Sequence, residues 1–138
     1  MFQLSNARSD VAQSAFIWSS KMYTDDILRF LPPDHVSLRD WNIIIVDVPN
    51  ECHEEIFVGY SEGDRLGRLS TPIKNYDANT GIGETRSGSS YMTIGEPGSP
   101  HDDAIYVLEQ TFGKDLIERE LFSDSGQSVL AFKYPLNK

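Results

Sequence analysis

Residues 41–48, Trp-Asn-Ile-Ile-Ile-Val-Asp-Val, decide the fold. The run is rich in β-branched residues and apolar at consecutive positions, which predicts a largely buried β-strand. Pro49 and Asn50 follow it, and both residue types are common in turns. Residues 55–60 are therefore expected to form the returning strand of a hairpin.

Three further strands are predicted downstream of this hairpin. A turn at residues 62–64 leads to a strand over residues 69–76, in which Pro72 favours an edge position because proline cannot donate a ladder hydrogen bond. Strands over residues 82–86 and 90–94 follow, separated by turn-forming residues at 77–81 and 87–89. This spacing predicts a meander.

Helices are expected on both sides of the strands. Residues 9–23 place Val11, Ala15, Trp18 and Met22 on one helical face, and a short continuation ends at Pro32-Pro33. A later helix is predicted from an N-cap at Ser99, with Pro100 in the first turn, to a stop at Gly113. Residues 116–122 favour a strand over a helix, and residues 129–134 predict a final strand.

This order of elements predicts the fold class. Consecutive strands with helices at either end are typical of an α+β fold, here a mostly antiparallel sheet of about five to seven strands. An N-terminal helix and one later helix are expected to pack on one face of it. With 138 residues, the chain is expected to form a single domain over residues 1–138.

Charge and composition limit the partners. The net charge is −9, spread along the chain, which disfavours direct binding to nucleic acids and to anionic membranes. The single cysteine, Cys52, fits a reducing compartment. No leader pattern and no apolar run long enough for a membrane span is present, so a cytoplasmic location is expected.

One segment resembles a known group of proteins. Ser70-Thr71-Pro72-Ile73, Thr85-Arg86-Ser87-Gly88-Ser89, Tyr91 and Gly95-Glu96-Pro97 are similar to a strand and hairpin segment of small uncharacterised bacterial proteins. The resemblance covers about 30 of the 138 residues. Met92 departs from the pattern, which usually has a basic residue after the tyrosine. Because no activity is assigned to that group, the resemblance implies a fold element only.

No pattern predicts a catalytic or metal site. Cys52-His53-Glu54-Glu55 groups a thiol, an imidazole and two carboxylates, but a structural zinc site needs four ligands in paired spacings. Adjacent strand residues point to opposite faces, so Cys52 and His53 do not make a catalytic pair. The carboxylates after His101 are explained by the start of a helix. No catalytic residue, metal ligand or cofactor is predicted.

The composition leaves three functions open. The first is a small acidic interaction module, such as a neutraliser or adaptor of a basic protein, which uses its charge and a sheet edge. The second is a small-molecule-binding protein or small enzyme with a pocket between helices and sheet. The third is a homodimer. An enzyme is not the favoured reading. The candidate binding residues are His53, Glu55, Arg86, Tyr91 and His101.

Overall fold

The computed structural model describes residues 35–123 and 129–137. Within these residues the chain forms a seven-stranded sheet and two helices. In chain order the elements are β1 (His35–Val48), β2 (Cys52–Ser61), β3 (Leu66–Leu69), β4 (Ile73–Asp77), β5 (Ile82–Thr85), β6 (Ser90–Thr93), α3 (Asp102–Phe112), α4 (Lys114–Leu121) and β7 (Leu130–Phe132).

The predicted fold class, a sheet with an N-terminal helix and one later helix packed on one face, is wrong. The sheet dominates the described residues, and two helices rather than one follow it, both from Asp102 onward. The described part of the chain holds no helix before the sheet, and the predicted helix over residues 9–23, with its continuation, lies outside the described residues. The fold is therefore a mostly antiparallel sheet with a late helical pair.

β1 contains a bulge, and its two halves pair with different strands: the first half with β6 and the second half with β7. The register against β2 shifts between Arg39 and Asn42, and Asp40 has a φ of 45°. Such a bulge adds one residue and reverses which positions face each side. As a result Leu38 and Trp41 lie on the same side of the sheet, which a regular strand does not allow.

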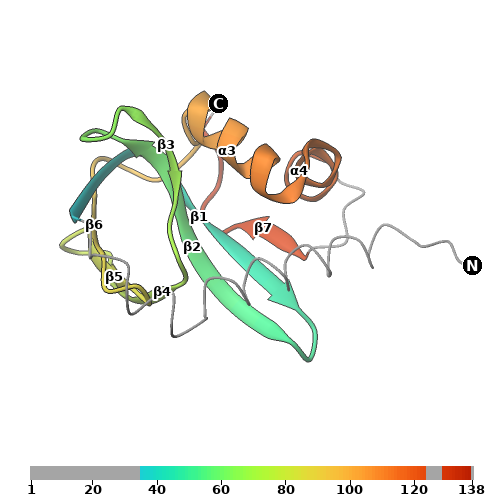
Figure 1. The fold of residues 1–138 in the computed structure, drawn as a ribbon, viewed down its shortest axis with the longest axis horizontal. Helices are drawn as coiled ribbons and strands as arrows, with labels where there is room; N and C mark the ends of the chain where they lie inside the picture. The colour runs from blue at the N-terminus through green and yellow to red at the C-terminus, as the bar shows by residue number, and fades with distance from the viewer. Residues whose placement is uncertain (1–34, 124–128, 138) are drawn as a thin grey trace, which may run out of the picture.

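The sheet order is β3-β2-β1-β6-β5-β4, with β7 paired to the second half of β1. Five strand pairs are antiparallel, and the pair of β1 with β6 is parallel. Figure 1 shows α3 and α4 on one side of the long β1–β2 hairpin and the β4–β6 strands on the other. The hairpin is therefore covered on both faces.

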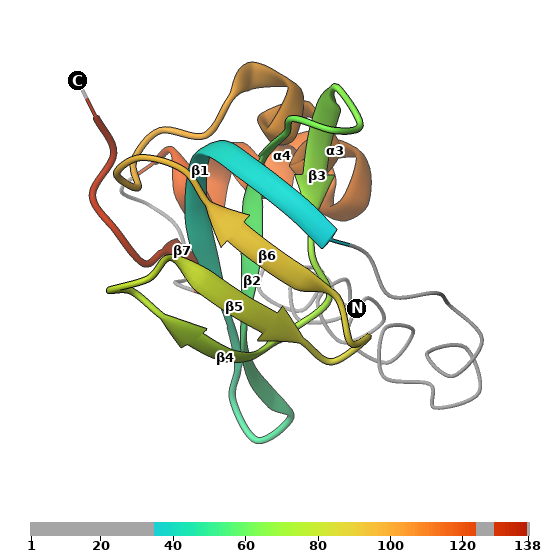
Figure 2. The same cartoon turned by 90° about the vertical axis from the view of Figure 1, so that its left-hand side faces the viewer.

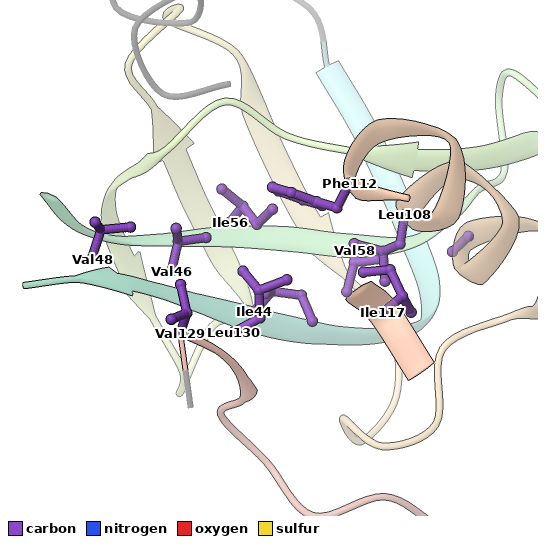
Figure 3. Close-up of a cluster of buried hydrophobic side chains, with 11 residues drawn as sticks. Ile44, Val46, Val48, Ile56, Val58, Leu108, Phe112, Ile117, Val129 and Leu130 are labelled. Atoms are coloured by element: carbon purple, nitrogen blue, oxygen red, sulfur yellow. The ribbon is translucent and has the colours of Figure 1, made fainter. Parts of the chain in front are cut away.

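Each face of the hairpin has its own core. The helix-side core joins β1, β2 and β7 to the two helices (Figure 3), and its buried members are Ile44, Val46, Val48, Ile56, Val58, Ala104, Leu108, Phe112, Ile117, Val129 and Leu130. The strand-side core contains Val36, Leu38, Trp41, Ile43, Phe57 and Tyr91. Two cores explain why residues 43–46 are apolar without alternation: Ile43 faces one core and Ile44 the other.

Residues 69–76 form two strands and not the single one that was predicted. β3 ends at Leu69 and β4 begins at Ile73. Ser70 interrupts the run because its backbone N–H donates to the carbonyl oxygen of Phe57 at 3.0 Å and its hydroxyl accepts from the N–H of Phe57 at 2.9 Å. The chain is thus held against β2 at this point, and Pro72 lies in the connection.

The C-terminal helices also differ from the predictions. Residues 116–122 were expected to be a strand, but α4 covers most of them; the helix buries Ile117 and lets the Glu120 carboxylate accept from the N–H of Val129 at 3.0 Å. The N-cap of α3 is His101 and not Ser99, because the His101 side chain accepts from the N–H of Asp103. Ser99 instead bonds to Asn137.

α3 packs closely on β3 at Gly67. A Cβ atom there would lie 2.3 Å from the backbone carbon and oxygen of Asp103. Gly67→Ala is expected to lower the free energy of unfolding by about 1–3 kcal/mol, because α3 must move away from β3. Urea denaturation measures the change. Gly63→Ala, where a Cβ meets nothing within 4 Å, is the matched control and should change the stability by less than about 0.5 kcal/mol. Equal effects at both positions would contradict this packing.

Candidate functional site

A pocket opens at one end of the strand-side core. Its volume is about 440 Å³. Figure 2 shows that the β4–β5 turn, the segment after β6 and the C-terminal segment gather at the same end of the sheet. We call this site the aromatic pocket, and its described lining residues are Trp41, Tyr76, Ala78, Asn79, Thr80, Gly81, Thr93, Gly95, Glu96, Pro97 and Tyr134.

Three aromatic rings define the pocket. The ring centroids of Trp41 and Tyr76 lie 5.9 Å apart, and those of Trp41 and Tyr134 also lie 5.9 Å apart. Both pairs are edge-to-face, with interplanar angles of 72° and 75°. Trp41 is only 2% exposed and forms the base, whereas Tyr76 and Tyr134 are half-buried and form the walls. Ring faces carry negative electrostatic potential, which attracts cations.

The loops around the rings are fixed by hydrogen bonds. The indole Nε1–H of Trp41 donates to the carbonyl oxygen of Gly95 at 3.0 Å. Across the pocket, the Thr93 N–H and hydroxyl both donate to the carbonyl oxygen of Gly81, at 2.7 and 3.1 Å. Gly81 has a φ of 75°, and a Cβ there would lie 2.9 Å from the Thr93 hydroxyl, so only glycine fits this turn. These bonds therefore hold the two loops on either side of the rings.

A buried amide holds the third ring in place. Asn42 is fully buried, and its Nδ2 donates to the carbonyl oxygens of Gly98 at 2.8 Å and Tyr134 at 3.0 Å. Its Oδ1 accepts from the N–H groups of Ile43 at 2.7 Å and Tyr134 at 3.2 Å. One side chain thus joins β1, the segment before α3 and the segment after β7. These bonds place Tyr134 against Trp41.

The pocket has a negative electrostatic character. Glu96 is exposed at its edge, and the described lining residues include no lysine, arginine or histidine. Burial raises the pKa of Tyr76; the hydrogen bond to Thr93 at 2.9 Å opposes this, and Tyr134, Asp77 and Glu96 raise it further. The Tyr76 phenol therefore stays neutral at physiological pH. A positive charge in this pocket meets the ring faces and the carboxylate of Glu96.

His53 and Glu55, two of the predicted candidates, lie on β2 away from the pocket lining. His53 is 66% exposed, and its Nδ1 lies 3.6 Å from a carboxylate oxygen of Asp47 on the neighbouring strand. Glu55 accepts a hydrogen bond from Lys133 Nζ at 2.9 Å, which raises the pKa of Lys133. Both side chains make surface pairs, one within the β1–β2 hairpin and one between β2 and the residue after β7.

The other three candidates also have structural roles. The Tyr91 ring is 2% exposed and stacks on Phe57, and its hydroxyl accepts from Arg68 Nε at 2.9 Å. Arg86 is exposed in the β5–β6 turn, where its backbone N–H donates to the carbonyl oxygen of Pro72. His101 caps α3 and packs on the ring of Tyr60, with the two ring centroids 4.5 Å apart.

The structure does not bring these five residues together, and none of them lines the aromatic pocket. Trp41 lies in the buried strand that was predicted over residues 41–48, whereas Tyr76, Tyr134 and Glu96 were not predicted as site residues. Glu96 lies within the Gly-Glu-Pro part of the resembling segment, which was the one available signal. Over residues 35–123 and 129–137, no three His, Cys, Asp or Glu side chains are grouped to hold a metal ion.

Comparison with known proteins adds no family. No protein-family model, curated protein or solved structure shows a significant match to this chain. The resemblance to small bacterial proteins therefore stays a prediction. Both described helices are too short and too polar to cross a membrane.

Proposed function

We propose that this chain is a cytoplasmic interaction module that binds a basic protein. The observation that carries the proposal is the aromatic pocket, in which Trp41, Tyr76 and Tyr134 surround a space with a carboxylate, Glu96, at its edge. The net charge of −9 acts in the same direction, because it accelerates encounter with a positively charged partner. The pocket supplies the specific contact and the overall charge supplies the attraction.

The proposal predicts a partner that is basic and a binding affinity that falls with salt. We expect the dissociation constant to rise at least about tenfold between about 0.1 M and about 1 M NaCl, because the Debye length shrinks from about 10 Å to about 3 Å. The experiment is capture on the immobilised full chain, followed by titration of the purified captured protein at several salt concentrations. A neutral or acidic partner, or an affinity that ignores salt, would contradict the proposal.

A second candidate function is the binding of a small molecule in the same pocket. Its volume of about 440 Å³ falls within the range of about 300–1,000 Å³ that is typical of ligand sites. The site differs from the one predicted between helices and sheet, where the interface is filled by the helix-side core. The molecular mass of the bound species distinguishes the two candidates, because a small ligand saturates the pocket without a protein partner.

Catalysis receives no support from the pocket. Its described lining includes one carboxylate and neither a cysteine nor a histidine, so a nucleophile with its base is not assembled there. Cys52 lies instead at the start of β2, partly buried against the helix-side core. The predicted homodimer stays a prediction, and a mass measurement in solution tests it.

A further inference from the structure

We infer that the aromatic pocket receives one cationic side chain of the partner, a lysine or an arginine, with the charged head between the rings of Tyr76 and Tyr134 and next to Glu96. The inference rests on the proposed function and names the group that is recognised. It commits to a side chain with a long aliphatic stem, because such a stem lets a charge leave the partner's surface and enter a recess.

The geometry of the walls favours a cation over a neutral group. A cation is attracted to an aromatic ring when it lies within about 6 Å of the ring centroid. Tyr76 and Tyr134 both contact Trp41 with ring centroids 5.9 Å apart, and all three side chains line the same pocket, so a head group that enters it meets aromatic surface. The polar hydrogen of the Trp41 indole, which would repel a cation, is already bound to Gly95.

Charge complementarity supplies the second argument. Glu96 lies on the edge of the pocket and Asp77 ends β4 beside it, close enough for both to affect the ionisation of Tyr76. Neither carboxylate has an ion pair among the described salt bridges. The nearby Lys133, whose charge interacts with Tyr76 and Tyr134, donates from its ammonium to Glu55 at 2.9 Å, so this charge is paired with a carboxylate outside the pocket lining. The negative charge at the edge is therefore available to a cation from outside.

The test uses small probes that do not depend on the partner. The full chain, labelled with ¹⁵N, is titrated with n-butylammonium, methylguanidinium and tetramethylammonium, and with neutral n-butanol and tert-butanol as uncharged analogues of the first and the last. The Trp41 indole N–H signal, assigned by comparison with Trp18→Phe, reports the pocket. We expect saturable shifts for the cations with an affinity at least about tenfold above that of the neutral analogues.

Two variants place the binding in the pocket. Glu96→Gln is expected to weaken cation binding about twofold to fivefold, as an exposed charge pair does. Tyr134→Leu removes one wall and is expected to weaken it about threefold to tenfold. Glu51→Gln makes the same charge change in the exposed turn between β1 and β2 and should leave binding unchanged. If Tyr134→Leu does not fold, the comparison of Glu96→Gln with Glu51→Gln still tests whether the cations bind in the pocket.

The three cations also distinguish the kinds of side chain that the pocket could bind. Stronger binding of n-butylammonium points to lysine, stronger binding of methylguanidinium points to arginine, and stronger binding of tetramethylammonium points to a methylated lysine. Neutral analogues that bind as well as the cations, or cations that do not bind, would overturn the inference.

The failure of this inference and of the proposed function are distinguishable. If a basic partner binds with salt dependence but Glu96→Gln and Tyr134→Leu leave its affinity unchanged, the proposed function stands and the pocket is not the recognition site. If the cations bind in the pocket but the captured protein is not basic, the pocket chemistry stands and the proposed partner is wrong.

Discussion

Phe57→Ala is expected to lower the free energy of unfolding by about 3–5 kcal/mol, the usual range for removing a fully buried phenylalanine. The side chain is 0% exposed. Its ring stacks on Tyr91 with centroids 5.1 Å apart and meets Tyr76 edge-on at 5.3 Å. It also lies against β5, where a Cβ on Gly83 would come within 2.8 Å of the Phe57 ring. Alanine therefore leaves a cavity between β2 and the strands β4, β5 and β6.

Urea denaturation of both proteins measures this loss, provided that the slope of the transition is unchanged. Phe122→Ala is the control, because the same atoms are removed from a side chain that is 48% exposed. That variant should lose less than about 1 kcal/mol. A loss for Phe57→Ala no larger than the control would mean that the strand-side core is not packed as described.

Asn42→Leu is expected to lower the free energy of unfolding by about 3–5 kcal/mol, although it keeps the number and branching of the side-chain heavy atoms. Leucine offers no hydrogen bond, so the carbonyl oxygens of Gly98 and Tyr134 and the N–H groups of Ile43 and Tyr134 lose the partner described above. Each buried polar group without a partner costs about 1–3 kcal/mol, and part of that cost is recovered when the chain relaxes.

Hydrogen exchange of the backbone amides tests the same variant locally. We expect the amide of Tyr134 to lose protection more than amides within α3, since the C-terminal segment is the part released first. Asn75→Leu, at an exposed position on β4, is the matched control and should change the stability by less than about 0.5 kcal/mol. Unchanged protection at Tyr134 would show that Asn42 does not hold the third wall of the pocket.

The strands could be predicted where turn-forming residues close to them in the sequence mark their ends. The hairpin at residues 49–50 is confirmed, and Asn50 adopts a φ of 65° there, as its residue type favours. The strands at 82–86 and 90–94 are also confirmed within a residue or two. The prediction of a strand at residues 116–122 was wrong because a short apolar run is compatible with the spacing of a strand and with that of a helix. The contact of Ile117 with the helix-side core, which favours the helix, is a tertiary contact that the local pattern does not contain.

The pocket was not predictable from the sequence, because its parts come together only in space. Tyr76 and Tyr134 lie far apart in the chain. Both contact Trp41, because a bulge turns Trp41 toward them and Asn42 holds the C-terminal segment in place. Sequence patterns favoured clusters of neighbouring residues, such as those around Cys52 and His101, whose members alternate between faces or cap a helix. The chemistry of a pocket assembled by tertiary contacts leaves no such local signal.

The three strands that pair with β1 lie at different distances from it in the sequence, so the three pairings form at different times. Its hairpin with β2 closes through a short turn, but its pairing with β6 joins residue 35 to residue 90, and its pairing with β7 joins residue 44 to residue 132. Contacts that distant in sequence form slowly, because a long loop must close first. During synthesis on the ribosome, the apolar second half of β1 therefore lacks one of its partners until β7 has been made, and this interval exposes it to aggregation.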